Sequence, residues 1–296
     1  MDLPTLIERY HDDDACRDLL ERLRWPNGVT CTRCGATGDR IARISTRDLW
    51  RCNECTYQFS VRVGTILQDS KLPLWKWFLA TYLIVEAKKG ISANQLKRML
   101  GVGSYRTAWF VSHRIRAAMG QVEHAPLTGV VEVDETYVGG KARGKGRGYR
   151  GNKTMVLGAV SRDGQIRLRV DKRADRRTLH GFIKAEVADN AEAIYTDEWP
   201  AYRGIGDADT PHETVNHRAE EWVRGQVHTN TAESAWSLFK RGVVGSYHQL
   251  SEKHLPAYLD EFEWRFNNRD NPHLFRDTLR VLVTADPMTY EALIAD

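Results

Sequence analysis

Four cysteines constrain the fold of this chain more than any other feature of its sequence. Cys31 and Cys34 form one C-x2-C pair, Cys52 and Cys55 form a second, and 17 residues separate the two pairs. This spacing is typical of a structural zinc site, because two short knuckles can turn four thiolates toward one tetrahedral ion. Two disulfides or four unrelated thiols are the alternatives. For a chain in a reducing compartment we predict a zinc ribbon over residues 29–62 that holds one structural Zn2+.

The residues between and around the cysteine pairs support a ribbon. Residues 40–44 and 49–51 predict a hairpin that would bring the two pairs together. Residues 1–28, ahead of the ribbon, contain a helical segment in which Cys16 is expected to be an ordinary buried thiol. Arginines around the site favour a nucleic-acid partner, and they are Arg33, Arg40, Arg43, Arg47 and Arg51. Zinc would supply much of the folding free energy of so small a module.

The overall composition is that of a folded chain with a mildly basic charge. It has 296 residues, 42% of them hydrophobic, a net charge of +4, and no apolar run near the roughly 18 residues that span a bilayer. Residues 1–4 do not begin a signal peptide, so we expect a cytoplasmic location. Basic side chains concentrate in one stretch without an acid, at Lys141, Arg143, Lys145, Arg147 and Arg150. We predict that this stretch contacts phosphates, and a solvated loop is the alternative.

Residues 70–122 have the apolar spacing of helices and are organised like a helix-turn-helix. Ser92 and Gln95 form a capping box that predicts the start of a short helix, and Gly101 predicts its end. A third helix is expected from Ser104 onward. Its basic side chains are Arg106, His113, Arg114 and Arg116. We predict that Arg106 and Arg114 contact DNA. The alternative is an ordinary three-helix bundle with a solvated basic face.

From residue 126 the pattern changes to strands. A β-branched run at residues 129–138 contains Asp134, and a later strand is expected to end at Asp197. Between them we predict a hairpin and a helix, over residues 154–160, 165–170 and 177–187. Two carboxylates are thereby placed on two different strands. Other acids nearby, which could simply be solvated, are Glu132, Glu135 and Glu198.

A third acid follows on a predicted helix at residues 228–241. Between Asp197 and Glu233 lie 35 residues, and Lys240 stands seven residues after Glu233, close to two helical turns. Asn230 lies about one turn before Glu233. Carboxylates from two strands and a helix are the oxygen ligands that two Mg2+ or Mn2+ ions need for phosphoryl transfer. Lys240 is then expected to hold a phosphate of the substrate as a point charge.

The joint pattern is similar to that of a known family. The segments that carry the likeness are residues 134–141, 195–197, 228–233, 240–242 and 258–267. Together with the zinc ribbon, they resemble the bacterial insertion-sequence transposases of the ISXO-like group over nearly the whole chain. The resemblance implies an α/β, RNase H-like catalytic core, with a mixed sheet and flanking helices, over residues 126–275, and a helical tail over 276–296. It also implies a DDE-type acid triad, double-stranded DNA partners (element ends and target DNA) and a homo-oligomer on DNA.

The family pattern leaves the third ligand open. Members have either Asn or Glu in this role, and this chain has both Asn230 and Glu233. The 35-residue gap and the lysine seven residues later favour Glu233. Asn230 is then a helper at the site, a neutral ligand or a helix N-cap. Arg241, next to Lys240, is a further expected DNA contact, and His228 could contact the substrate or cap the turn.

These expectations define a hypothesis for function. The protein is expected to bind the terminal inverted repeats of an insertion sequence and to cut and join DNA strands with magnesium. A catalytically silent zinc-ribbon regulator derived from such an enzyme is one alternative, and the presence of Asp134, Asp197, Glu233 and Lys240 counts against it. A general nuclease of the same fold is another, and the added DNA-binding modules count against that. The expected location is the bacterial cytoplasm, at the nucleoid when the protein is bound to DNA.

Overall fold

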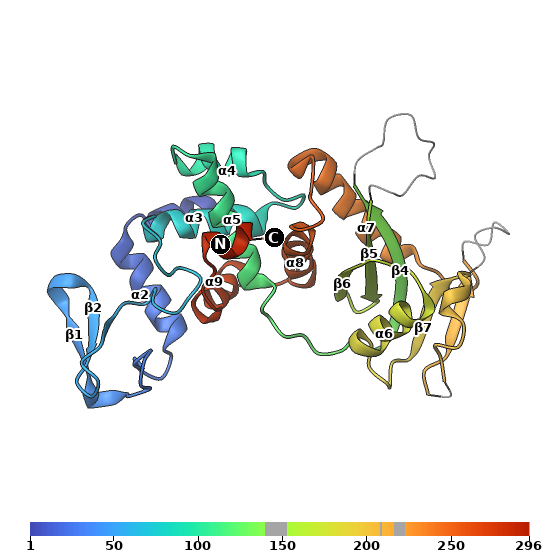
Figure 1. Cartoon of the computed structure of the whole chain (residues 1–296), viewed down its shortest axis with the longest axis horizontal. Helices are drawn as coiled ribbons and strands as arrows, with labels where there is room; N and C mark the ends of the chain where they lie inside the picture. Colours follow the sequence, from blue (N-terminus) through green and yellow to red (C-terminus); the bar gives the residue numbers. More distant parts are fainter. Residues whose placement is uncertain (140–152, 208, 216–222, 296) are drawn as a thin grey trace. The chain divides into compact units, whose positions relative to one another are not determined.

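The computed structural model describes residues 1–139, 153–207, 209–215 and 223–295. The chain divides into two compact units: unit 1 combines residues 1–122 with 270–296, and unit 2 consists of residues 123–269. Figure 1 shows the elements of both units. None of the helices within the described ranges is long and apolar enough to cross a membrane. The basic stretch predicted to contact phosphates, from Lys141 to Arg150, lies outside the described residues.

The helices of unit 1 come from both ends of the chain. Their bounds are α1 Leu3–Arg9, α2 Asp13–Arg24, α3 Leu74–Glu86, α4 Ala93–Leu100, α5 Tyr105–Met119, α9 Leu274–Thr284 and α10 Tyr290–Ile294. Short polar side chains start several of them, as where Ser92 accepts a hydrogen bond from the amide of Gln95 at the predicted cap of α4. The same helix ends at Gly101, whose φ of 58° is the left-handed conformation that glycine adopts without strain.

Helix α5 packs against α3, α4 and α9, and most of its length is buried within unit 1. Ala108, Val111 and Ile115 are buried as expected, but so are three of its basic residues, His113, Arg114 and Arg116. The fully exposed positions of this helix lie in its first turn, from Tyr105 to Thr107. The outward basic face that the sequence predicts is therefore limited to Arg106, because the other basic side chains face the core of the unit.

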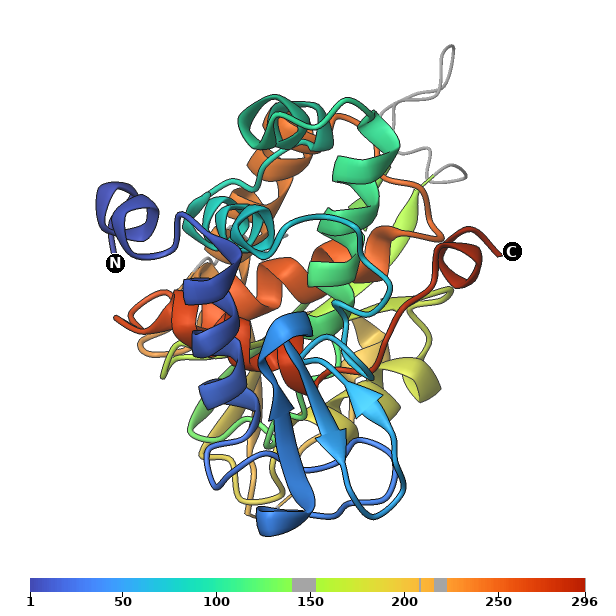
Figure 2. The same ribbon diagram turned by 90° about the vertical axis from the view of Figure 1, so that its left-hand side faces the viewer.

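The zinc-ribbon segment folds as a three-stranded antiparallel sheet of β1 Ile41–Ile44, β2 Leu49–Cys52 and β3 Gln58–Phe59. Single helical turns, η1 Gly38–Arg40 and η2 Ser45–Arg47, flank β1. Strands β1 and β2 pair along their whole length, so the predicted hairpin is confirmed. Glu21 of α2 accepts hydrogen bonds from Arg43 at 2.8 Å and from the Trp50 indole at 2.9 Å. These contacts hold the ribbon sheet beside α2, as Figure 2 shows.

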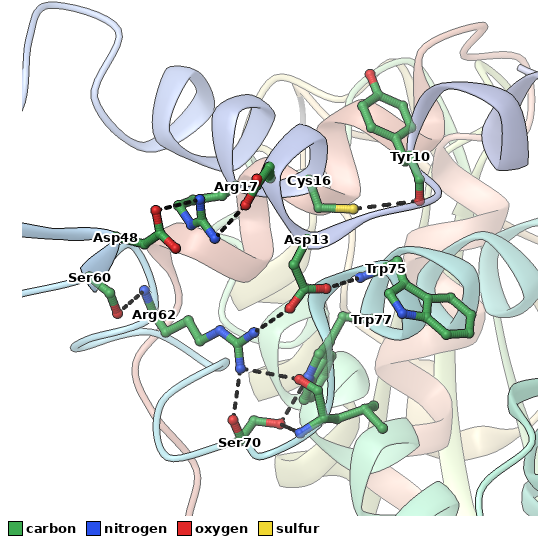
Figure 3. A network of polar contacts seen from close by, with 12 residues as sticks. Tyr10, Asp13, Cys16, Arg17, Asp48, Ser60, Arg62, Ser70, Trp75 and Trp77 are labelled. Atoms are coloured by element: carbon green, nitrogen blue, oxygen red, sulfur yellow. Dashed lines mark hydrogen bonds and ion pairs between the residues drawn. The ribbon is translucent and has the colours of Figure 1, made fainter. Parts of the chain in front are cut away.

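A polar network joins the end of the ribbon to the helices of unit 1 (Figure 3). Arg62 donates to the backbone carbonyls of Ser70 and Leu72 at 2.8 and 3.1 Å, and its second terminal nitrogen lies 3.5 Å from Asp13. The other oxygen of Asp13 accepts the amide of Trp75, at the start of α3, at 3.2 Å. Burial lowers the pKa of Arg62. A partly buried guanidinium is costly unless it is paired, so this network fixes the ribbon to the helices.

Unit 2 is built on a five-stranded mixed sheet in the order β6-β5-β4-β7-β8. The strands are β4 Val130–Val138, β5 Thr154–Ser161, β6 Ile166–Asp171, β7 Ala193–Asp197 and β8 His212–Val215. Strands β4, β5 and β6 pair antiparallel, and the predicted turn between β5 and β6 has Gly164 at a φ of 96°. On the other side of β4, β7 and β8 are parallel to it. Strand β4 is thus the central strand of the sheet.

Helices cover both faces of this sheet (Figure 1). Their bounds, with two shorter turns, are α6 Arg176–Glu186, η3 Pro200–Tyr202, α7 Asn230–Gly242, η5 Val243–Tyr247 and α8 Leu255–Asn267. On one face Val131 and Leu157 pack against Phe182 of α6. On the other face Val156 packs in one core with Trp236 of α7 and with α8. A mixed sheet between helices is the RNase H-like α/β core that the sequence predicts.

The C-terminal helices pack with unit 1. The ring of Phe275 on α9 lies 5.8 Å from that of Phe78 and 6.0 Å from that of Tyr82, both on α3. Tyr290 of α10 contacts Phe110 of α5, with ring centroids 5.5 Å apart. The sequence predicts the end of the catalytic domain at residue 275, whereas the structural division falls after residue 269. The difference arises because Phe275 belongs to the aromatic core of unit 1.

Candidate functional site

Asp134 lies at the middle of β4, on the face of the sheet that α7 covers. Side chains alternate along a strand, so Glu132 and Asp134 share one face, while Val131 and Val133 enter the core under α6. Hydrogen bonds from the first turn of α7 to Glu132 identify this face. The residue opposite Asp134 on β5 is Gly158. No side chain from that position competes for the space next to the carboxylate.

Asp197 is the last residue of β7, which runs parallel to β4. In the register of the two strands Glu132 pairs with Tyr195. Asp134 and Asp197 each stand two residues further along, so this register directs both acids to the same end of the strand pair. The amide of Trp199 donates to Asp197 Oδ1 at 3.0 Å, which holds the carboxylate at the point where the chain leaves the sheet.

Helix α7 carries the third acid. Glu233, Ser237 and Lys240 are exposed and recur at about one helical turn, so they share an outward face. Trp236 does not belong to that face, because it is 5% exposed and packs against the sheet. A Cβ atom at Gly158 would lie 2.7 Å from Cη2 of Trp236. The glycine therefore lets α7 approach β5 closely, directly beside the position of Asp134.

Asn230 is the first residue of α7 and is exposed. The N-cap position belongs to Thr229, and no side chain there makes a capping hydrogen bond. The interpretation of Asn230 as the N-cap is therefore wrong. Its other two interpretations, a neutral ligand or a helper at the site, remain predictions, as does the choice of Glu233 as third ligand.

The surroundings of Asp134 shift its pKa strongly. Burial first, and then the negative charges of Glu135, Asp197 and Glu233, raise its pKa to about 7, against a smaller opposing effect of the Glu135 amide. That amide donates to Asp134 Oδ1 at 2.9 Å. The charges of Asp197 and Glu233 therefore act on Asp134. A carboxylate in such surroundings regains its charged form most readily when a cation binds beside it.

The ligand atoms of the acids do not converge as closely as those of the cysteines. Within the described residues, the four cysteines alone form a group of three or more His, Cys, Asp or Glu side chains whose ligand atoms converge on a possible ion position. The chemistry of the acids nevertheless fits a hard cation, since Asp134, Asp197 and Glu233 offer only carboxylate oxygens. A bound cation would reduce the electrostatic repulsion among these carboxylates.

The cysteine site fits zinc in both chemistry and geometry. All four sulfurs lie within 4.8 Å of one another, with Cys31 Sγ 3.7 Å from Cys55 Sγ and Cys34 Sγ 3.6 Å from Cys52 Sγ. Zn–S bonds of about 2.3 Å in a tetrahedron place the sulfurs about 3.8 Å apart, whereas a disulfide requires about 2.05 Å. The fifth cysteine, Cys16, is 0% exposed, and burial raises the pKa of its thiol to about 12. Zinc binding by the ribbon is thus supported, and Cys16 is the buried thiol that the sequence predicts.

The predicted DNA-contact residues that the structure describes divide into exposed and buried ones. Arg106 and Arg241 are exposed. Arg114 is 4% exposed and donates to the backbone carbonyl of Gln68 at 2.6 Å. Burial lowers its pKa to about 10. The predicted DNA contact of Arg114 is therefore contradicted, because its guanidinium is occupied inside unit 1.

Glu132, the acid two residues before Asp134, is a buried residue whose role the sequence did not indicate. Glu132 is 0% exposed, and it lies 3.1 Å from Arg162 and 3.2 Å from His228. The possibility that Glu132 is solvated is wrong. Side chains alternate along a strand, so Glu132, two residues before Asp134, must lie on the same face of the sheet as Asp134. The sequence therefore contained a signal for this position.

Two family models match the chain. The ISXO2-like transposase domain matches residues 126–267, and the transposase zinc-ribbon domain matches residues 11–58. A Halobacterium salinarum protein described as "Uncharacterized protein in transposable element ISH50" is 30% identical over 281 residues, which cover 88% of this chain and 92% of that protein. The "Uncharacterized transposase-like protein" of Haemophilus influenzae is 27% identical over 93 residues, 31% of this chain and 73% of that protein.

Solved structures show weaker similarity. A chain of the simian T-cell lymphotropic virus intasome in complex with PP2A regulatory subunit B56 gamma is 13% identical, with a TM-score of 0.30 over 63% of this chain and 64% of that one. A pre-cleavage Mos1 transpososome chain is also 13% identical, with a TM-score of 0.27 over 72% of this chain and 80% of that one. Both scores are low, so the fold assignment rests on the sheet and helices of unit 2. From the family models and the halobacterial relative, this chain belongs to the ISXO2-like transposase family, with a DDE domain behind a transposase zinc ribbon.

Proposed function

We propose that this protein is a DDE-type DNA transposase that binds the terminal inverted repeats of its insertion sequence and catalyses Mg2+-dependent strand cleavage and strand transfer. The observation that carries the proposal is the register of the parallel strands β4 and β7, which directs Asp134 and Asp197 to the same end of the strand pair. Burial and then the charges of Glu135, Asp197 and Glu233 raise the pKa of Asp134 to about 7. Acids from two strands and a helix thus share one electrostatic environment, within a domain of a transposase family. A relative described as part of a transposable element supports the same function.

In this proposal Asp134, Asp197 and Glu233 bind two divalent ions, Mg2+ or Mn2+. When bound, such ions would lower the pKa of the attacking oxygen and stabilise charge on the leaving oxygen. Lys240, on the exposed face of α7 with Glu233, binds an oxygen of a substrate phosphate. Asn230, one turn before Glu233, supplies a neutral amide to the same edge of the site. The residues of the chain thereby orient the phosphate for in-line attack.

Two phosphoryl transfers at these acids would complete the reaction. In the first, water attacks a phosphodiester at the end of the element, the bond from phosphorus to the 3′ oxygen breaks, and this oxygen gains a proton. In the second, the new 3′-hydroxyl attacks a target phosphodiester, loses its proton and expels a target 3′-hydroxyl. One phosphodiester forms as another breaks in this second step, so no external energy source is needed. Neither step requires a covalent bond to the protein.

DNA contacts are proposed for both units. Arg106 begins α5 in unit 1, and Arg241 follows Lys240 in unit 2, with both arginines exposed. Exposed cations on the ribbon could add phosphate contacts, at Arg33, Arg47 and Arg51. Contacts of this kind position a protein on DNA without reading its sequence. We further propose that the protein acts as a homo-oligomer on element ends and target DNA, at the nucleoid of a bacterial cytoplasm.

Cleavage of element-end DNA tests the proposal. The full-length protein is incubated with Mg2+ and a labelled duplex that carries the element's end, and nicked and joined products are quantified. We expect cleavage by the wild type and none above background by Asp197→Asn, which keeps the shape of the side chain but not its charge. Asp175→Asn is the matched control, because Asp175 caps α6 through Thr178 and Asn caps helices equally well. Wild-type protein that binds the duplex without cutting it would be a regulator, and the enzymatic proposal would fail.

A further inference from the structure

Glu132 is a buried carboxylate to which the proposed reaction assigns no role. It is 0% exposed and stands on β4 two residues before Asp134, on the same face of the sheet. A carboxylate removed from water is strongly disfavoured unless donors replace its hydration. The identity of those donors therefore indicates what the residue does.

Five contacts surround the Glu132 carboxylate. Thr231 donates its backbone amide at 2.8 Å and its hydroxyl at 2.9 Å, and Ala232 donates its amide at 3.1 Å. Arg162 Nε lies at 3.1 Å and His228 Nδ1 at 3.2 Å. A carboxylate offers about four lone-pair positions, so these contacts occupy it fully. Glu132 is consequently not available as a ligand for an ion beside Asp134.

The three contacts from Thr231 and Ala232 tie the first turn of α7 to the strand that carries Asp134. Both residues directly precede Glu233. The residue at the N-cap position, Thr229, makes no side-chain capping bond. Glu132 instead accepts the free amides of this helix end, where the helix dipole favours a negative charge. One turn later Trp236 rests on the sheet, so the helix is fixed at two successive turns.

We propose that Glu132 is a positioning residue of the acid site, which holds the first turn of α7 on β4 so that Glu233 and Asp134 can bind the same ions. The proposal rests on the proposed function, because it gives the position of α7 a role in ion binding. Glu132 itself touches neither the ions nor DNA. Arg162 and His228 complete the set of contacts around the Glu132 carboxylate.

A Mg2+ titration of DNA cleavage by Glu132→Gln tests this role. The amide keeps the size of the side chain but loses its charge and one of its two acceptor oxygens. We expect the Mg2+ concentration for half-maximal cleavage to rise about 10- to 100-fold, the range found when a residue that orients metal ligands is changed. Cleavage at saturating Mg2+ should recover toward the wild-type rate. Thr231→Val, which removes only the hydroxyl contact, should give a smaller rise in the same direction.

Glu261→Gln is the matched control for lost stability. Glu261 is also 0% exposed and lies in unit 2, where it accepts from the Tyr247 hydroxyl at 2.7 Å and pairs with Arg265 at 3.1 Å. We expect this variant to melt at a lower temperature while its Mg2+ requirement stays at the wild-type value. If both variants change the Mg2+ requirement equally, or if Glu132→Gln changes only the melting temperature, Glu132 is a structural residue and the positioning role is overturned.

Binding of Mn2+ to the DNA-free full-length protein, followed by electron paramagnetic resonance, separates this proposal from the proposed function. Asp134→Asn defines binding elsewhere on the chain. We expect Glu132→Gln to weaken the remaining Mn2+ binding by the same factor as in the cleavage titration. Weakened binding without any wild-type cleavage would refute the transposase activity and support the positioning role. Unchanged Mn2+ affinity in Glu132→Gln, or wild-type binding no stronger than that of Asp134→Asn, would refute the positioning role.

Discussion

The cysteine site and the acid site of this protein are assembled in different ways. Four sulfurs from residues 31–55 lie within 4.8 Å of one another on a single ribbon. The acids come from residues 134, 197 and 233, on two strands and a helix. The charges of Asp197 and Glu233 act on Asp134, but the three acids do not converge as closely as the sulfurs. A closed set of thiolates suits a structural ion, whereas an open set of carboxylates leaves coordination positions for substrate oxygens.

The two sites therefore differ in what stabilises the fold around them. The ribbon has little core of its own, so the ion has to stabilise the fold. In unit 2 apolar cores lie on both faces of the sheet, and this packing holds Asp134 among other negative charges. The sheet and α7 therefore stabilise a site that is electrostatically unfavourable until a cation binds. Four predictions would break or sharpen this comparison.

Cys52→Ser should have the largest effect. It removes one of four thiolates at a position that is 0% exposed, and structural zinc contributes on the order of 10 kcal/mol to the folding of such modules. We expect loss of bound zinc and rapid amide exchange in β1, β2 and β3, measured by metal analysis and hydrogen exchange. Cys16→Ala should keep one zinc per chain. Full zinc content in Cys52→Ser would contradict the four-thiolate site.

Glu233→Gln should come next, with a loss of element-end cleavage greater than about 100-fold, because a ligand of the ions should matter more than a residue that only orients ligands. Its fold should be unaffected, since Glu233 is exposed on α7. Asn230→Ala, one turn away on the same helix, is the comparison and should keep most of the activity. If Asn230→Ala alone abolishes cleavage, the third ligand is Asn230.

Gly158→Ala should lower the free energy of unfolding by about 1–3 kcal/mol, the usual cost of overpacking a core. The added methyl group would overlap the ring of Trp236 and push α7 away from the sheet. Gly181→Ala in α6 is the control, because a Cβ there meets no atom within 4 Å. Denaturant titrations in which both variants unfold like the wild type would show that α7 is not held closely at this point.

The pH dependence of stability tests the charge environment of Asp134. The pKa of Asp134 rises from 3.8 to about 7 in the fold, so between these values the folded protein binds more protons than the unfolded chain. The free energy of unfolding without metal should therefore fall as the pH rises from about 4 to about 7, and Mg2+ should oppose the fall.

Two other carboxyl groups contribute to this trend, so the measurement is a difference. Burial also raises the pKa of Asp260 and of Glu263 to about 7. The melting temperature of the wild type minus that of Asp134→Asn, followed from pH 4 to 7, isolates the contribution of Asp134. Parallel curves for the two proteins would contradict the unfavourable charge environment at this residue.

Sequence reasoning succeeded where neighbours in the chain decide the structure. The cap at Ser92, the ribbon hairpin and the turn at Gly164 all depend on residues only a few positions apart. It failed for side chains whose direction depends on another element. Arg114 has the position of a solvent-facing cation in its own helix, yet the Gln68 carbonyl and the surrounding core bury it. The sequence also does not predict that Gly158 on β5 leaves room for the ring of Trp236 on α7.

By itself the sequence determined the zinc ribbon, the identity of the family and the candidate acids, because cysteine spacing and short motifs carry that information locally. Only the tertiary structure decided which charged residues are buried and what they hold. Glu132 and Thr231 are 99 residues apart, and no local pattern predicts that the first accepts hydrogen bonds from the second. Their contact exists because β4 is the central strand and α7 packs across it. The position of Glu233 relative to Asp134 depends on that long-range packing.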